Sequence, residues 1–75
     1  MTLSVEQVRE VIVTTVRNYQ PLSAIDGRPI QLDAERMFRD IHPQNYSSKY
    51  AFLANLEAAS QAQVEEENAR RSKSA

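Results

Sequence analysis

SVEQVREVIVTTVRNY (residues 4–19) decides the fold class of this chain, because it carries signals both for a helix and for a strand. Ser4 is a good N-cap, and Gln7 three positions later completes a capping box. Residues 11–16 are all β-branched, which favours a strand. The apolar side chains nevertheless recur at helical spacing: Val5, Val8, Ile12, Val16 and Tyr19. We therefore predict a helix from Ser4 to about Tyr19, ended by Pro21, with an edge strand as the alternative.

The next segment, residues 20–32, reads as a structured loop. Pro21 and Pro29 bar a continuous helix, and Asp26-Gly27 is a turn signal. A small hairpin about Asp26-Gly27 is an alternative. The apolar content is too high for a free linker: Leu22, Ile25, Ile30 and Leu32. We expect the loop to lie across the core.

Two further helices are predicted. The first runs from the N-cap Asp33 to about Ile41 and is short. Its apolar stripe consists of Ala34, Met37, Phe38 and Ile41. The last helix begins at Ser47 or Ser48, and its helix propensity stays high to about Arg71. A helix from Ser48 to Arg71 would span about 36 Å. Its C-terminal third is expected to overhang the core with nothing in the chain to pack against.

These elements predict a small all-α domain over residues 1–71, with a frayed tail at 72–75. It has three helices, a short middle one, a structured loop between the first two and an overhanging C-terminal helix. The alternative is an α+β fold with a short strand or hairpin within 11–32. The predicted core consists of Val5, Val8, Ile12, Val16, Leu22, Ile25, Ile30, Met37, Phe38, Ile41, Phe52, Leu53 and Leu56.

Composition excludes several ways of stabilising so small a domain. The chain has 75 residues, no cysteine and one histidine, so disulfides and thiolate zinc sites are impossible. A domain of this length buries only about 60–65% of its unfolded surface. Association with a partner or with a second copy is the remaining usual source of stability.

Catalytic chemistry finds little support in the residues. His42 stands alone and is better explained as a surface residue that closes a helix than as a general base. Gly27 is the only glycine, which argues against a phosphate-binding loop. The acidic residues lack the alternating spacing of a calcium loop. We expect no enzyme activity, no cofactor, no metal and no small-molecule substrate.

The predicted function is a non-catalytic protein-interaction module, an adaptor or accessory subunit that docks through its C-terminal helix on another protein or on its own copy. The residues expected to bind the partner are Tyr46, Tyr50, Leu53, Leu56, Val64, Arg70 and Arg71. The alternative is a small regulator that contacts nucleic acid directly or through a partner. It requires the basic residues Arg70, Arg71 and Lys73, with Arg36 and Arg39, to converge on one surface. The net charge of −1 argues against such binding.

Targeting signals are not apparent. The only apolar run near the N-terminus contains Glu6, Arg9, Glu10 and Arg17, which a signal peptide would not tolerate. The longest uncharged apolar run, residues 11–16, is too short to span a membrane. We expect no membrane association and a cytoplasmic location.

Overall fold

The structure is a computed structural model that describes residues 2–74. Its described residues form three helices: α1 (Val5–Asn18), α2 (Ala34–Ile41) and α3 (Lys49–Ser74). The strand-like contacts within this range are two isolated bridges, Leu3 with Tyr46 and Leu22 with Pro29, and they form no sheet. The predicted all-α fold is therefore confirmed, and the α+β alternative is not.

Helix α1 contains the β-branched run because caps and burial together outweigh its strand propensity. Ser4 Oγ accepts from the Gln7 N–H at 3.2 Å, and Gln7 Oε1 accepts from the Ser4 N–H at 2.8 Å. Asn45 Oδ1 accepts from the Val5 N–H at 2.8 Å, so a distant loop satisfies another free donor of the first turn. Val8 and Ile12 are fully buried, and their burial holds a helix that would be weak alone.

Helix α2 is short and closed at both ends. Asp33 is its N-cap, and its carboxylate accepts from the Arg36 N–H at 3.3 Å. His42 is its C-cap with a left-handed backbone, φ 53°, and its N–H donates to the Phe38 carbonyl. His42 thus closes the helix, as the sequence predicts.

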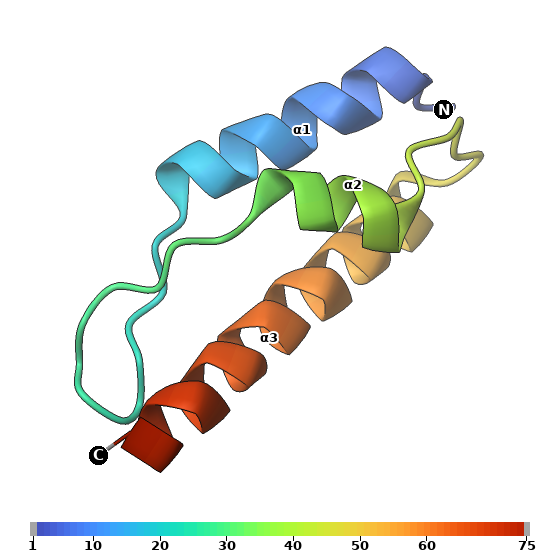
Figure 1. The fold of residues 1–75 in the computed structure, drawn as a ribbon. Coiled ribbons are helices and arrows are strands. Elements are labelled where there is room, and N and C mark those ends of the chain that lie inside the picture. The colour runs from blue at the N-terminus through green and yellow to red at the C-terminus, as the bar shows by residue number, and fades with distance from the viewer. Residues whose placement is uncertain (1, 75) are drawn as a thin grey trace.

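Helix α2 lies between α1 and α3 and packs against both (Figure 1). Contacts between α1 and α3 themselves are fewer within the described residues. The core cluster joins side chains of all three helices with two from the loops: Val8, Ile12, Leu32, Met37, Ile41, Tyr46, Phe52, Leu56 and Ala59. The Tyr46 and Phe52 rings meet at a centroid distance of 5.4 Å, and Ile30 is also buried.

Three predicted core residues are exposed instead: Leu22, Ile25 and Leu53. Leu22 is 65% exposed, because the loop contacts the helices through Ser23, Ile30 and Leu32 and its other face meets solvent. Leu53 lies on α3 toward α1, at a point where the two helices do not close over it. Conversely, Leu32, Tyr46 and Ala59 are buried, although they were not among the predicted core residues.

Helix α3 does not overhang as predicted. The loop of residues 19–33 folds back along its C-terminal part, so the last turns do have a partner within the chain (Figure 1). The helix also continues through Ser74, past the predicted end at Arg71. Ala75, the end of the expected frayed tail, lies outside the described residues. The described chain is elongated, with extents of 45 × 18 × 17 Å.

Candidate functional site

Arg71 links the loop of residues 19–33 to the end of α3. Its guanidinium donates to Asp26 Oδ1 at 2.9 Å, to the Arg28 carbonyl at 3.2 Å and to the Pro29 carbonyl at 3.1 Å. The planar fork of arginine suits such simultaneous bonding to several oxygens. The side chain is mostly buried as a result, so Arg71, which was predicted to bind a partner, is engaged within the chain.

Glu67 orients this guanidinium from within α3. It accepts from Arg71 Nε at 2.7 Å and from Arg70 through both carboxylate oxygens, at 2.7 and 2.6 Å. Hydrogen bonds from Arg70 and Arg71 lower the pKa of Glu67 from 4.5 to about 2. The pKa of Asp26 is also lowered, chiefly by the hydrogen bond from the Arg28 N–H.

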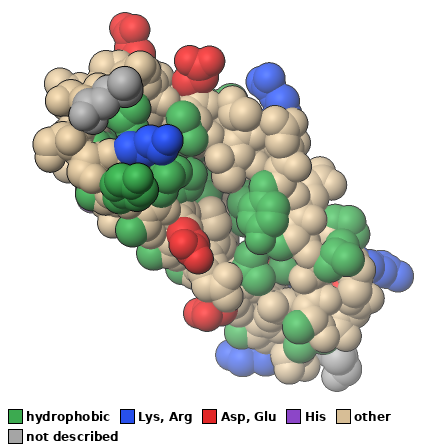
Figure 2. Space-filling view, turned by 180° about the vertical axis from the view of Figure 1, so that it is seen from behind, with side chains coloured by type: hydrophobic (Ala, Val, Ile, Leu, Met, Phe, Trp, Pro, Cys, Tyr) green, Lys and Arg blue, Asp and Glu red, His purple; other side chains and the backbone are tan. Residues whose placement is uncertain are grey.

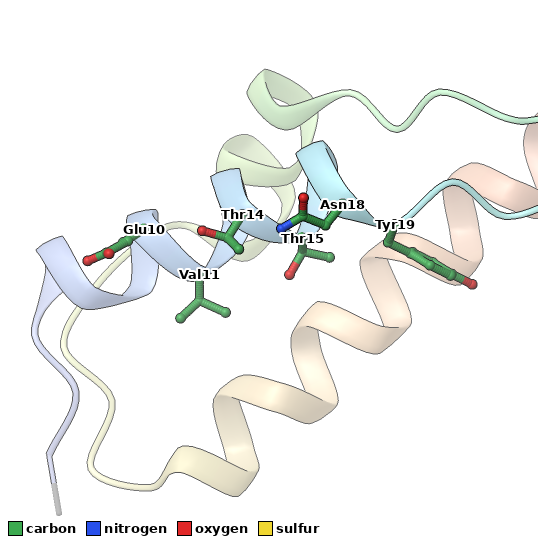
Figure 3. Close-up of a pocket in the computed structure, with 6 residues that line it drawn as sticks. All are labelled: Glu10, Val11, Thr14, Thr15, Asn18 and Tyr19. Atoms are coloured by element: carbon green, nitrogen blue, oxygen red, sulfur yellow. The ribbon is translucent and has the colours of Figure 1, made fainter.

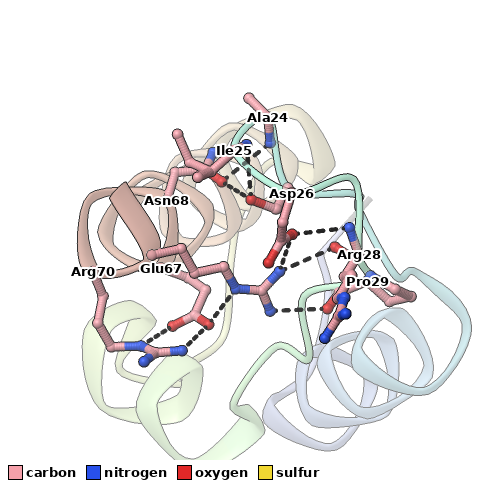
Figure 4. A network of polar contacts seen from close by, with 10 residues as sticks. Ala24, Ile25, Asp26, Arg28, Pro29, Glu67, Asn68 and Arg70 are labelled. Atoms are coloured by element: carbon pink, nitrogen blue, oxygen red, sulfur yellow. Dashed lines mark hydrogen bonds and ion pairs between the residues drawn. The ribbon is translucent and has the colours of Figure 1, made fainter. Parts of the chain in front are cut away.

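A second link joins the same loop to α3 one turn earlier. The Ser23 hydroxyl donates to Asn68 Oδ1 at 2.6 Å, and the Ala24 N–H donates to the same oxygen at 3.2 Å (Figure 4). Gly27, with φ 69°, supplies the left-handed turn that lets the loop double back. We call the set Ser23, Asp26, Glu67, Asn68 and Arg71 the clasp.

The basic residues needed for nucleic-acid binding partly converge, but acidic residues accompany them. A polar depression between α2 and α3 includes Arg36, Arg70 and Arg71 in its lining together with Asp33, Glu66 and Glu67. Arg36 pairs with Glu66 at 2.5 Å, which lowers the pKa of that carboxylate. The charges of this surface are therefore largely balanced internally, and counterion release on phosphate binding would gain little from it.

Two adjoining hollows lie along α1, and one of them reaches α3, where the two helices do not close on each other. One hollow of about 450 Å³ follows α1, lined by Glu10, Val11, Thr14, Thr15, Asn18 and Tyr19. A second of about 400 Å³ crosses to α3, lined by Thr15, Tyr19, Leu53, Leu56, Glu57, Ser60 and Gln61. Thr15 and Tyr19 line both, so the hollows adjoin. We call them together the α1–α3 groove.

The groove has an apolar floor that solvent reaches. Val11, Tyr19 and Leu53 are all exposed large hydrophobic residues. Figure 3 shows Val11, Thr15 and Tyr19 projecting from α1 on its side toward α3. Seen from behind, the molecule carries hydrophobic side chains at several places along its length, with most charged side chains toward the margins (Figure 2). Exposed apolar residues gathered in one hollow are typical of binding surfaces.

The residues predicted to bind a partner fall into two sets. Tyr46 and Leu56 are buried, and Val64 packs against the core. The Tyr46 hydroxyl donates to the Ile41 carbonyl and accepts from Asn55, so its polar end is also used internally. Arg70 and Arg71 pair with Glu67. Of the original set, Tyr50, 82% exposed, Leu53 and Arg70 remain on the surface.

Val11 and Thr15, which line the groove from α1, were missed by sequence reasoning. Val11 and Thr15 lie beside the main apolar stripe of α1. Residues in such positions are interpreted as the edge of the buried face and not as part of a binding surface. The width of the apolar face of α1 could have indicated an uncovered part. This face is wider than α2 can bury, because it includes Val5, Val8, Val11, Ile12 and Val16.

The described residues also bear on a catalytic histidine, a metal site and a membrane-spanning helix. His42 is exposed and forms the end of α2. Over residues 2–74, no group of three or more His, Asp or Glu side chains is arranged to hold a metal ion. In the same part of the chain, no helix combines the length and apolar character needed to cross a membrane.

No protein-family model matches this chain, and comparisons with curated proteins and with solved structures also give no match.

Proposed function

We propose that this chain is a non-catalytic interaction module, an adaptor or accessory subunit, that binds an apolar segment of a partner protein in the α1–α3 groove. The observation that carries the proposal is the exposure of Val11, Tyr19 and Leu53 along adjoining hollows. A domain this small has few apolar residues to spare from its core, so leaving three of them in one groove needs a compensating role.

The clasp supports the same proposal. It ties the loop to α3, and the loop continues from the end of α1 at Tyr19. The two walls of the groove are thereby linked at one end by the clasp and at the other by their packing on α2. Walls held in place before binding lose less conformational entropy when a partner docks.

A matched pair of substitutions tests the proposal. Val11 and Val13 are exposed to the same degree, 36% and 37%, but they lie two residues apart and so point to different sides of α1. Partner proteins captured with the wild-type chain are identified, purified and titrated against it. We expect Val11→Asp to weaken binding at least about tenfold, as for a charge buried at an interface, and Val13→Asp to leave it unchanged.

The amide signals of the chain locate the contact during the same titration. The proposal requires shifts at Thr15, Tyr19 and Leu53. Equal loss of binding in both valine variants, or shifts confined to another surface, would overturn it. If the free protein self-associates and the same amide signals shift, the occupant of the groove is a second copy of this chain and not a different protein.

A further inference from the structure

The walls of the α1–α3 groove favour one mode of peptide recognition. Both walls are helices whose main-chain hydrogen bonds run within each helix, so they offer no free strand edge to an added β-strand. What they offer is apolar side chains between two helix axes. Such a surface takes the apolar stripe of a further helix, which would complete a bundle around Tyr19 and Leu53.

The length of the groove agrees with this mode. On α1 the lining runs from Glu10 to Tyr19, and on α3 it runs from Leu53 to Gln61. At a rise of about 1.5 Å per residue these stretches span roughly 12–14 Å. Anchors at positions i, i+4 and i+7 of a partner helix span roughly 10 Å, so the groove accommodates about two turns.

The charge of the groove sets the chemistry of its occupant. Among the residues that line the two hollows, the charged ones are Glu10 on α1 and Glu57 on α3. Neither forms an ion pair with another described residue, whereas Asp26, Glu66 and Glu67 all do. One carboxylate therefore lines each hollow without an ion-pair partner among the described residues. A ligand that carries cations beside its apolar stripe would pair with both.

We propose that the α1–α3 groove binds an amphipathic helix whose apolar stripe is flanked by lysine or arginine. The inference rests on the function proposed above and adds the class of partner. Glu10 and Glu57 act as the selective elements. They attract a basic helix and repel an acidic one of the same apolar pattern.

Two synthetic peptides test this selectivity. Each has about 18 residues, roughly 27 Å as a helix, with leucine at the same helical positions. One carries lysine beside the leucines, and the other carries glutamate. Binding to the full chain is followed by fluorescence anisotropy and by amide shifts at low ionic strength. We expect the basic peptide to bind at least about tenfold more tightly and to shift Thr15, Tyr19 and Leu53.

Two double variants assign that preference to the groove. Glu10→Gln with Glu57→Gln should bring the affinity ratio close to one while groove shifts persist. The control, Glu6→Gln with Glu65→Gln, removes the same charge from exposed positions of α1 and α3 and should retain the ratio.

The outcomes separate the two proposals. Equal groove binding by both peptides, or loss of the preference in the control variant, would overturn the charge selectivity and leave the proposed function standing. Tighter binding of the acidic peptide than of the basic one would also overturn the charge selectivity and leave the proposed function standing. Absence of amide shifts at the groove with either peptide would overturn the helix-binding inference. The proposed function would then be decided separately, by the binding of the captured partner to Val11→Asp and Val13→Asp.

Discussion

Gln63 holds both main-chain groups of Asp33, thirty positions earlier in the chain. Its Oε1 accepts from the Asp33 N–H at 2.7 Å, and its Nε2 donates to the Asp33 carbonyl at 3.1 Å. Gln63 is buried in α3, and Asp33 is the N-cap of α2. One amide side chain thus replaces the hydrogen bonds that the main chain would otherwise make with water at the start of a helix. It fixes where α2 begins against α3.

Replacing Gln63 with alanine should therefore destabilise the fold. The substitution leaves the Asp33 N–H without its partner and leaves the Asp33 carbonyl with the Met37 N–H alone, and we expect a loss of about 1–3 kcal/mol in the free energy of unfolding. Urea denaturation followed by circular dichroism measures it. Gln61→Ala is the control because Gln61 is an exposed glutamine on the same helix, and its effect should stay within about 0.5 kcal/mol. Similar effects of the two variants would contradict the role given to Gln63.

The clasp predicts local rather than global loosening when Arg71 is replaced. Arg71→Met keeps much of the apolar stem but removes every contact to Asp26, Arg28 and Pro29. We expect several-fold faster hydrogen exchange at the loop amides of Ser23 and Ile30, which are hydrogen-bonded within the loop.

Two comparisons make this prediction specific. The amide of Ile12 in the core should keep most of its protection. Lys73→Met removes a positive charge from an exposed position near the same end of α3 and should leave the loop unchanged. Equal acceleration in the loop and the core of Arg71→Met would show that the clasp stabilises the whole domain.

The free energy of unfolding should fall at acidic pH because Glu67 becomes protonated. Its pKa is about 2 in the folded chain and 4.5 ordinarily, so the folded state binds protons less readily than the unfolded state. Its contribution is fully present above about pH 4.5 and is lost as the pH falls toward 2. The lowered pKa values of Asp26 and Glu66 act in the same direction.

Glu67→Gln should accordingly be less stable than the wild type at pH 7, and the two stability curves should converge toward pH 2. Urea denaturation across this range measures both curves. Parallel curves would mean that Glu67 gains nothing from Arg70 and Arg71 in the folded state.

A pair of isoleucines tests where the core lies. Ile12 is fully buried, whereas Ile25 was predicted to be buried and is exposed. Removing one methyl group as Ile12→Val should cost about 0.5–1.5 kcal/mol. The same change as Ile25→Val should stay below about 0.5 kcal/mol. Equal costs in thermal or urea denaturation would place Ile25 in the core after all.

His42 offers a route to greater stability. Its φ of 53° is costly for a residue with a Cβ atom, whereas glycine adopts this conformation freely. His42→Gly should raise the free energy of unfolding by up to about 1 kcal/mol, and His42→Ala should give no such gain. Equal stability of the glycine and alanine variants would indicate that α2 ends differently in solution.

Local signals made the helices predictable. The Ser4–Gln7 capping box and the Asp33 cap form as predicted, because each depends on residues three positions apart. The periodic burial of Val8, Ile12, Met37 and Ile41 follows from helical geometry in the same way. His42 at the end of α2 was also within reach of local reasoning, since Pro43 follows it.

The candidate site was less predictable because it depends on which helix faces which. Leu53 and Tyr50 were identified from the stripe of α3, and both are on the surface. Val11 and Thr15 were not identified. Nothing local shows that α2 separates α1 from α3 and leaves one side of α1 uncovered.

The sequence by itself determined the three helices, their caps and the class of the fold, because these follow from interactions within a few residues of the chain. Only the tertiary structure decided the course of the 19–33 loop and whether the C-terminal part of α3 has a packing partner. Arg71 reaches Asp26 across 45 positions, and Asn68 reaches Ser23 across the same separation. Such contacts carry no periodic signal, since they exist only once packing on α2 has brought the two segments together. The same packing leaves the α1–α3 groove open.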